Sequence, residues 1–345
     1  MDLRLSEEQR QLARGAREFL ADACPPATVH DAAGPNSLLD RVLWKQCAAV
    51  GFLAITVPEA QGGLGLGLLD LVAVVEEAGR ALLPLPLLET AVVADVLARY
   101  GRTGVHREWL SRIADGDLVA VVVLPGQRLV CDADGAHLFL CLDDAGGLHA
   151  VPRDEVRVRR CVTSYGGRRL STVAGALDAT TELGPAPHAG RRLVNATAVA
   201  NAALLLGICD HLLEATVEHV TVRHQFGRPV GSFQAVKHRL ADAHVALETA
   251  RPSVWAAAHQ IDREDADADV ASAIAAIAAA HAHQVTNEQA LQCHGGMGFA
   301  HDNPLHLWLT QGKDVERAYG SVRQHRARLG RALLHPNRTD EEYAR

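Results

Sequence analysis

LVNATAVANAALLLGICDHLLEATVEHVTV, residues 193–222, decides the fold, because it is rich in apolar and small residues over a length that only a long helix uses. Three further stretches of this kind follow it, and Pro252 inside the first of them predicts a kink. The three stretches are Phe233–Asp262, Asp267–His294 and about Gly320–Leu334. Long helices joined by short loops pack side by side, so residues 191–345 are predicted to form a C-terminal four-helix bundle.

Upstream, residues 1–116 are predicted to form an N-terminal helical domain. Ser6-Glu7-Glu8-Gln9 has the pattern of a capping box, in which the first and last residues close a helix N-terminus reciprocally. Apolar residues at helical spacing mark further helices, which are Leu38–Val50, Leu69–Leu83 and Leu88–Tyr100. The glycine-rich stretch Val57–Gly65 between the first two is interpreted as a turn.

Residues 117–190 have a different pattern and are predicted to form a small β-domain. Short β-prone segments are separated by turn signals such as Pro125-Gly126. The segments are Leu118–Leu124, Arg128–Cys131, His137–Leu142, Leu148–Val151 and Val156–Val162. The fold class is therefore α+β and mostly α, in the order N-terminal helical domain, small β-domain, C-terminal four-helix bundle.

Composition argues against several classes of function. The 345 residues carry a formal net charge of −7, which does not favour nucleic acid or an anionic membrane as a partner. The seven cysteines include no CxxC pair, and the charged start MDLRLSEEQR is unlike a signal peptide, so a cytoplasmic location is expected. Uninterrupted apolar runs such as Val119–Leu124 are too short for a membrane span. No histidine spacing matches a metal motif, so no metal site is expected.

Two segments of the bundle carry candidate chemistry. In RHQFGRPVGSFQAVKH, residues 223–238, one helix ends, Gly227 turns the chain and a new helix begins. Arg223 has the geometry to pair with a phosphate, and Gln234 stands near the new helix N-terminus, which favours an anion. In QCHGGMGF, residues 292–299, the glycines would let the backbone approach a ligand closely. From these residues alone, a surface loop with a helix-end arginine and a plain glycine cap are equally open alternatives.

Together these segments resemble the acyl-CoA dehydrogenase family, and the resemblance covers most of the chain. VPEAQGGLG at 57–65 is similar to the family's N-terminal turn, and the segments at 223–238 and 292–299 are similar to its flavin-contacting ones. GRALLPLPLLET at 79–90 is most similar to short actinobacterial members, several of which work as heteromeric pairs on steroid or other CoA thioesters. The resemblance implies an FAD-dependent oxidoreductase of lipid metabolism that acts on an acyl-CoA thioester and passes electrons to an acceptor flavoprotein.

In this family FAD lies across a subunit interface, and the resemblance implies which residues contact it. Arg223 and Gln234 match positions on the pyrophosphate and adenosine side, and the glycine loop matches contacts to the same half. The implied cofactor-binding residues are Arg223, Gln225, Phe226, Gln234, Gln292, Cys293, His294, Gly295, Gly296 and Ser321. They would serve a flavin bound mainly by a neighbouring subunit.

The family's catalytic base is a glutamate that removes the α-proton while hydride leaves the β-carbon for the flavin. Tyr319 matches that position, and Thr197 matches the alternative position that some members use. A tyrosine of ordinary pKa, about 10, is a poor base near neutral pH. Glu316 and His325 are nearby substitutes, but the alignment places neither at the base position. The catalytic residue is therefore unknown from the sequence.

The β-domain departs from the family as well. Active members carry threonine and serine there that hydrogen-bond the flavin ring, whereas the matching stretch Val119–Gly126 has no hydroxyl. The leading hypothesis is a subunit of a heterotetramer that donates its cofactor residues to a second, catalytic chain. The alternatives are an autonomous homo-oligomeric dehydrogenase with an unusual base, such as a Tyr319 of strongly lowered pKa, and a non-catalytic scaffold that binds thioesters. The acyl group is left open among a steroid side chain, a short branched chain and a carrier-bound chain.

Overall fold

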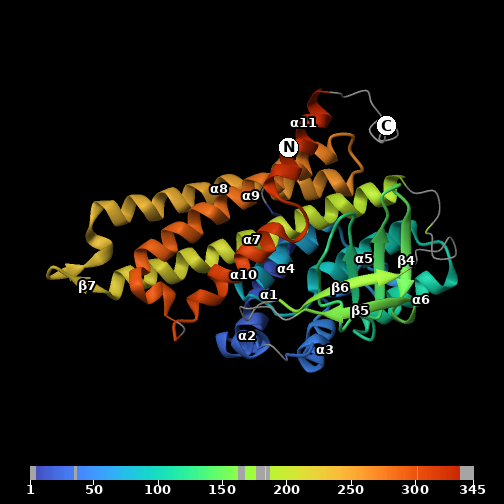
Figure 1. The fold of residues 1–345 in the computed structure, drawn as a ribbon, viewed down its shortest axis with the longest axis horizontal. Coiled ribbons are helices and arrows are strands. Elements are labelled where there is room, and N and C mark those ends of the chain that lie inside the picture. Colours follow the sequence, from blue (N-terminus) through green and yellow to red (C-terminus); the bar gives the residue numbers. More distant parts are fainter. Residues whose placement is uncertain are drawn as a thin grey trace.

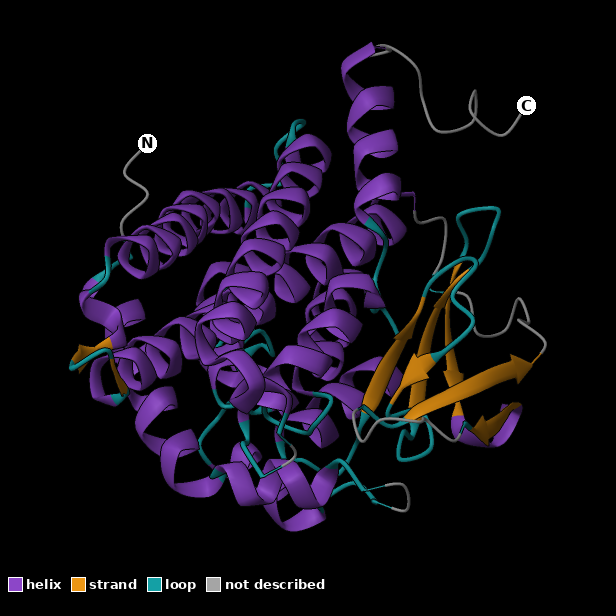
Figure 2. Ribbon diagram, turned by 60° about the vertical axis from the view of Figure 1, so that its left-hand side comes forward, coloured by secondary structure: helices purple, strands orange, loops and turns teal. Residues whose placement is uncertain are grey.

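The computed structural model describes residues 5–34, 37–161, 168–175, 183, 187–300 and 302–334. Helices come first, short strands follow, and long helices complete the chain, so the predicted order of elements is confirmed (Figure 1). Figure 2 shows most of the strands gathered on one side of the helical body, with a short hairpin on the opposite side. The division into domains at 116/117 and 190/191 stays a prediction.

The N-terminal part consists of short helices around an apolar core. Its helices are α1 (Glu7–Ala23), α2 (Pro26–Ala32), α3 (Arg41–Ala49), α4 (Leu68–Arg80), α5 (Leu87–Tyr100) and α6 (Gly104–Ala114). The capping box is confirmed, since the Gln9 N–H donates to Ser6 Oγ and the Ser6 N–H donates to Gln9 Oε1. The second predicted helix starts later than expected, at Arg41 rather than Leu38, because Asp40 Oδ1 accepts from the first free N–H groups and fixes the start there.

The β-domain contains two small sheets. In the first, β1 (Ala120–Val123) runs parallel to β3 (Leu138–Leu142), which pairs antiparallel with β4 (Leu148–Pro152). In the second, β6 (Leu170–Gly175) lies between β2 (Val130–Cys131) and β5 (Val156–Arg160). The sequence did not predict β6. The predicted end of the last strand, Val162, lies outside the described residues.

The C-terminal part is built on three long helices that lie side by side in Figure 1. They are α7 (Pro187–Val222), α8 (Gln234–Asp262, with Pro252 inside it) and α9 (Ala268–His294). A two-stranded hairpin, β7 (His224–Gln225) and β8 (Arg228–Pro229), joins the first two. By length and composition α7 could cross a membrane, but 83% of its most apolar window is buried inside the protein, as in the core helix of a globular domain.

Two shorter helices, α10 (Leu305–Ala318) and α11 (Val322–Leu334), complete the C-terminal part. The sequence analysis named no helix between His294 and about Gly320, and α10 fills part of that interval, ending at Ala318. The apolar face of α10, with Leu305, Trp308 and Val315, is buried, but Gly312 and the charged residues around it hide its period in the sequence.

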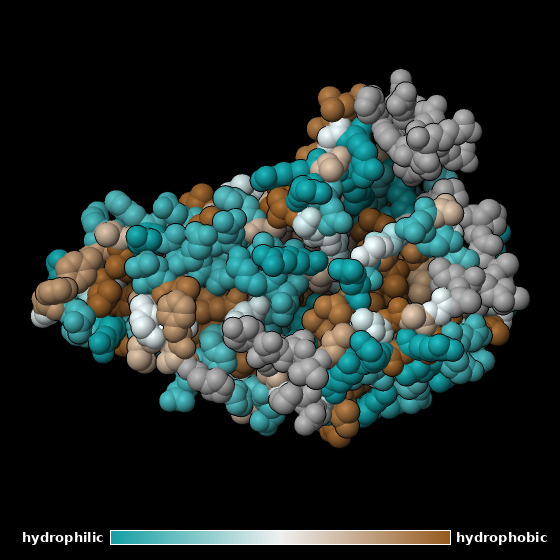
Figure 3. Space-filling view, viewed as in Figure 1, coloured by the Kyte–Doolittle hydropathy of each residue, from teal (hydrophilic) through white to brown (hydrophobic). Residues whose placement is uncertain are grey.

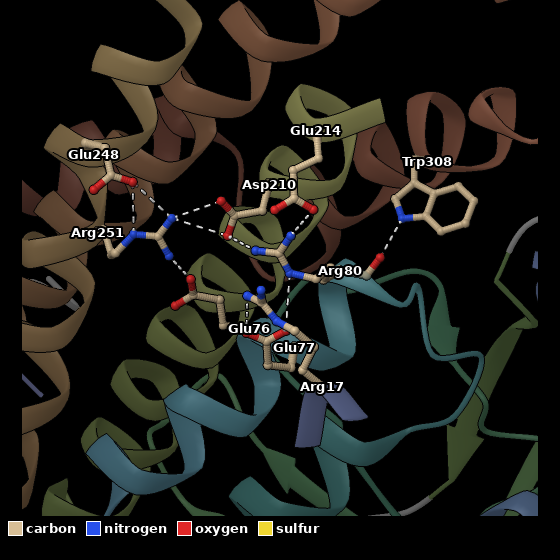
Figure 4. Close-up of polar contacts among 9 residues, drawn as sticks. All are labelled: Arg17, Glu76, Glu77, Arg80, Asp210, Glu214, Glu248, Arg251 and Trp308. Atoms are coloured by element: carbon tan, nitrogen blue, oxygen red, sulfur yellow. Dashed lines mark hydrogen bonds and ion pairs between the residues drawn. The ribbon is translucent and has the colours of Figure 1, made fainter. Parts of the chain in front are cut away.

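The N-terminal helices join the bundle where α4 crosses α7. A Cβ at Gly207 would overlap the carbonyl oxygen of Glu76, so only glycine permits this backbone contact. A partly buried network of ion pairs connects α4 and α7 at the same contact (Figure 4). In it Asp210 lies 2.9 Å from Arg80 Nη2 and 3.1 Å from Arg251 Nη2. Burial raises the pKa of Asp210 to about 7, and Arg80 opposes that rise. The network also contains Arg17, Glu76, Glu77, Glu214 and Glu248.

Candidate functional site

The first predicted site segment forms the tip between α7 and α8. Phe226 and Gly227 turn the hairpin with φ of 53° and 77°, which is the left-handed region. The Arg228 guanidinium lies 4.0 Å from the centre of the Phe233 ring, and the Phe226 ring meets Phe233 edge-on. These contacts hold the hairpin in place, while the side chain of Arg223 at its base is exposed.

The glycine loop at the end of α9 lies beside this hairpin. His294 is buried, and its ring stacks on that of His219 in α7 at 4.2 Å between ring centres. The two segments, more than 50 residues apart in sequence, therefore meet at one end of the bundle, as the resemblance implied. Ideal Cβ atoms at Gly295 and Gly296 would meet no atom within 4 Å, so the backbone there faces open space.

The predicted cofactor residues fall into two groups. Three are engaged inside the chain: burial raises the pKa of the Cys293 thiol, His294 Nδ1 lies 2.9 Å from the Ala290 carbonyl oxygen, and Ser321 exchanges capping hydrogen bonds with Gln324 at the start of α11. The others are exposed on the surface and are Arg223, Gln225, Phe226, Gln234, Gln292, Gly295 and Gly296. The exposed group is the one that a ligand or a partner could reach.

The hairpin end lies far from the chain's own β-domain. In Figures 1 and 2 the strands β7 and β8 stand at the opposite side of the molecule from β4, β5 and β6. The 36 residues of α7 separate the two regions, which corresponds to roughly 54 Å of helix. This separation exceeds the length of one dinucleotide, so the two regions of one chain do not contact the same FAD.

Tyr319, which the resemblance places at the position of the family's base, is buried and hydrogen-bonded. Tyr319, 7% exposed, donates its hydroxyl to Glu89 Oε1 at 2.6 Å, and Arg168 Nη2 donates to the same oxygen at 2.8 Å. Burial, and then the charge of Glu89, raises the pKa of Tyr319 well above its ordinary value. A Tyr319 of strongly lowered pKa, which was one base considered for the autonomous alternative, does not agree with this environment, because the phenol is buried and donates its proton to Glu89 in a hydrogen bond.

The other candidate bases are engaged as well. Thr197 is fully buried and donates its hydroxyl to the Leu193 carbonyl oxygen. Glu316 Oε2 lies 3.0 Å from both His283 Nδ1 and Lys313 Nζ, and these hydrogen bonds lower its pKa to about 2. Burial lowers the pKa of His325. Glu316 is therefore a weak base, held in a structural pair.

The comparisons with known proteins agree with this geometry. The model of the acyl-CoA dehydrogenase N-terminal domain matches residues 6–117, and that of the C-terminal domain matches residues 189–334. The chain belongs to the acyl-CoA dehydrogenase family. It is 32% identical to the acyl-CoA dehydrogenase IpdE2 of Mycobacterium tuberculosis, over 92% of each chain.

Solved structures show the same likeness. The ChsE4-ChsE5 complex from Mycobacterium tuberculosis contains a chain that is 28% identical, with a TM-score of 0.87 over 97% of this chain and 99% of that one. The steroid ACAD Tcur3481-Tcur3483 gives the same identity and TM-score over 96% and 98%. This acyl-CoA dehydrogenase is therefore an FAD-dependent oxidoreductase, and FAD is the cofactor with which it works.

The described residues of this acyl-CoA dehydrogenase fit only one half of FAD. The exposed guanidinium, amides and open glycine backbone at the hairpin end suit a pyrophosphate and an adenosine. At the other end, β1 is an apolar and mostly buried strand, and the cavity that Glu89 and Arg168 line has a volume of about 30 Å³. Ligand pockets typically measure about 300–1,000 Å³. Among the residues that the structure describes, this region does not fit an isoalloxazine ring together with a thioester.

Sequence reasoning missed Glu89 and Arg168. Glu89 is the single acidic residue within the apolar run from Leu85 to Ala94, and it is only 1% exposed. A lone acid at a position where a helix face is otherwise apolar signals a buried, partnered carboxylate. No comparable signal marks Arg168, because its partner is 79 residues away in the chain.

Proposed function

We propose that this chain is one subunit of a heteromeric acyl-CoA dehydrogenase, and that it donates one half of a flavin site to a catalytic partner chain. The observation that carries the proposal is the distance between the two ends of the chain. Exposed donors gather at the hairpin end, roughly 54 Å of α7 away from a β-domain whose own ring-binding region is closed. In this proposal, each end of the chain therefore needs another chain to complete a flavin site.

Each donated residue has a stated role in this proposal. Arg223 pairs its guanidinium with the pyrophosphate, and Gln234 adds its amide at the N-terminus of α8, where the helix dipole favours an anion. Gly295 and Gly296 let the dinucleotide approach the backbone. Bound by these residues, FAD would supply the acceptor for a hydride from the β-carbon of the acyl thioester. The α-proton is removed by a glutamate of the partner chain.

Exposed apolar side chains at the hairpin end support a protein interface there. Val222, Phe226, Met297 and Phe299 are 68%, 90%, 56% and 76% exposed. Figure 3 shows apolar residues at this end of the molecule. Large apolar side chains that gather on one surface mark an interaction site, because their burial against a partner removes apolar area from water.

The likeness to a steroid ACAD and to the ChsE4-ChsE5 complex supports two finer points. The assembly is a heterotetramer, and the substrate is a CoA thioester of a steroid-derived acid. The complex works in the cytoplasm and passes its electrons to an acceptor flavoprotein.

One observation favours a second function. Glu89 is a carboxylate within hydrogen-bond distance of Tyr319, so an autonomous dehydrogenase would use Glu89 as its base. Such an enzyme would bind its own flavin ring and would oxidise a thioester without a partner. The closed cavity stands against this function.

The test is co-expression with a second acyl-CoA dehydrogenase-like chain that has the base glutamate, followed by measurement of flavin per chain. The proposal expects one FAD for each pair of chains, turnover of steroid-derived CoA thioesters by the pair, and a colourless preparation of this chain alone. A yellow preparation of this chain alone that oxidises thioesters would refute the proposal and establish the second function.

A further inference from the structure

Three distant parts of the chain each supply one side chain to a single buried cluster. Glu89 lies in the first turn of α5, Arg168 just before β6, and Tyr319 at the end of α10. The side chain of Arg168 is 11% exposed and that of Glu89 is 1% exposed. The cluster therefore joins the N-terminal helices, the β-domain and the C-terminal helices at one point.

Hydrogen bonds connect the three side chains of the cluster to one another. The Glu89 carboxylate accepts hydrogen bonds on Oε1 from the neutral phenol of Tyr319 and from the guanidinium of Arg168. A buried carboxylate paired in this way is costly to separate from its partners, because each charge would be left without water or a counter-ion. The position of Glu89 in the first turn of α5 adds the favourable helix dipole.

The cluster borders the small cavity where the family's base would work. Glu89, Arg168 and Gln311 are its polar lining residues, and the rest of the lining is apolar, chiefly leucine. Its volume of about 30 Å³ leaves room for roughly one water. Glu89 Oε2 and Arg168 Nη1 are buried and have no partner among the described residues. The cluster therefore places two buried polar groups on a cavity that is too small for an acyl chain.

We infer that Glu89, Arg168 and Tyr319 form a lock that holds the three parts of this chain together and keeps its own cavity closed to a thioester. The inference rests on the proposed function and deepens it, because it explains why a chain that donates to a partner's site does not also use its own. In this view Tyr319 connects the end of α10 to Glu89 through its hydroxyl. Glu89 is the acceptor that both other side chains share.

A buried cysteine near Arg168, Cys131, can report whether the lock is intact. Cys131 is 5% exposed, and it pairs with Leu170 across the β2–β6 ladder, two residues beyond Arg168. Burial raises the pKa of its thiol to about 12, with Arg168 and Glu89 within electrostatic reach. Cys141 is equally buried in the other sheet of the same β-domain, within the apolar cluster that packs the two sheets together, and is the matched control.

The test measures maleimide labelling of each cysteine in the full chain by peptide mass spectrometry. We expect Glu89→Gln to raise the labelling rate of Cys131 roughly tenfold to a hundredfold, the size of losing a hydrogen bond to a charged group, with Cys141 unchanged. Tyr319→Phe should give a smaller rise, since the ion pair persists. Unchanged labelling of Cys131 in both variants would overturn the inference. So would an equal rise at Cys141, which would show that the cluster only stabilises the β-domain.

Butyryl-CoA is the probe for the cavity itself. We expect it to leave the labelling rate of Cys131 in the wild-type chain unchanged, because the closed cavity admits no acyl chain. A wild-type rate that changes with butyryl-CoA would show that a thioester reaches the cavity, and would contradict the lock. Flavin stoichiometry does not enter this measurement, so the lock and the proposed half-site fail separately.

Discussion

The polar groups at the hairpin end and those around Tyr319 lie in opposite environments: the first are exposed to solvent and the second are buried. At the hairpin end, Arg223 and Gln234 point their donors outward, and the glycine backbone beside them faces open space. Around Tyr319, the donors and the one carboxylate are buried and bonded to each other. The difference supports the proposal that this acyl-CoA dehydrogenase donates part of a flavin site to another chain, because the polar groups that are accessible lie at the hairpin end and those around Tyr319 are not.

The largest effect is expected from breaking the closed region. Glu89→Ala should lower the free energy of unfolding by about 3–5 kcal/mol, because it leaves the buried Arg168 charge without its partner. Chemical denaturation of the full chain measures this loss. Glu108→Ala, an exposed position on α6, is the control and should cost about 0.5 kcal/mol or less. Equal losses in the two variants would show that the Glu89 pair contributes nothing.

A change at the hairpin end should affect binding and leave stability alone. Arg223→Ala should weaken FAD retention by the assembled complex by roughly ten- to a hundredfold, as expected when a hydrogen bond between charged groups is lost. Arg157→Ala, which removes an exposed guanidinium from β5, is the matched control. Flavin titration of both variants decides the matter, and equal affinities would contradict the assignment of Arg223.

The charge on Glu316 allows a prediction with a pH dependence. Its folded pKa of about 2 lies below the ordinary 4.5, so its pair with His283 and Lys313 stabilises the fold above pH 4.5 and is lost as the pH falls toward 2. Glu316→Gln should therefore cost about 1 kcal/mol at neutral pH, after allowance for solvent screening of a partly exposed group. Denaturation at neutral pH and again below pH 4 should show the gap between variant and wild type shrinking. A gap independent of pH would disprove the pairing.

The smallest effect is expected on turnover. Tyr319→Phe should leave the rate of the heteromeric enzyme nearly unchanged, because the α-proton is removed in the other chain. Loss of a general base typically costs about 10²–10⁴-fold. A loss of that size in steady-state kinetics, with flavin content and folding intact, would show that the closed region takes part in the chemistry after all.

The sequence predicted most of the elements, because each depends on a local pattern. The capping box at Ser6, the strands β1–β5 and the long helices α7–α9 follow from spacing within a few residues. The sequence analysis did not name α2, α6, β6, the hairpin strands β7 and β8, or α10. The strand β6 and the helix α10 show why, since both have weak local signals. The strand β6 is held by pairing with β2 and β5, and the apolar face of α10 is interrupted by Gly312 and its charged neighbours.

The candidate site shows the same division. The residues of the hairpin end could be named from the sequence, because two short motifs contain them. Their meeting depends on the stacking of His219 on His294, and their distance from the β-domain depends on the length and direction of α7. The sequence also showed that Tyr319 stands where the family has a glutamate, but it did not show what Tyr319 contacts.

What the sequence determined by itself is thus the order of elements and the family, and it also predicted that Tyr319 takes the position of the family's base. Only the tertiary structure decided that Glu89 and Arg168 close on Tyr319, since Glu89 is 230 residues away from it in the chain. The physical reason is that periodicity and capping act over a few residues and specify local structure. Which buried charges meet depends on how the finished helices and sheets pack, because a buried carboxylate persists only where distant segments bring it a donor.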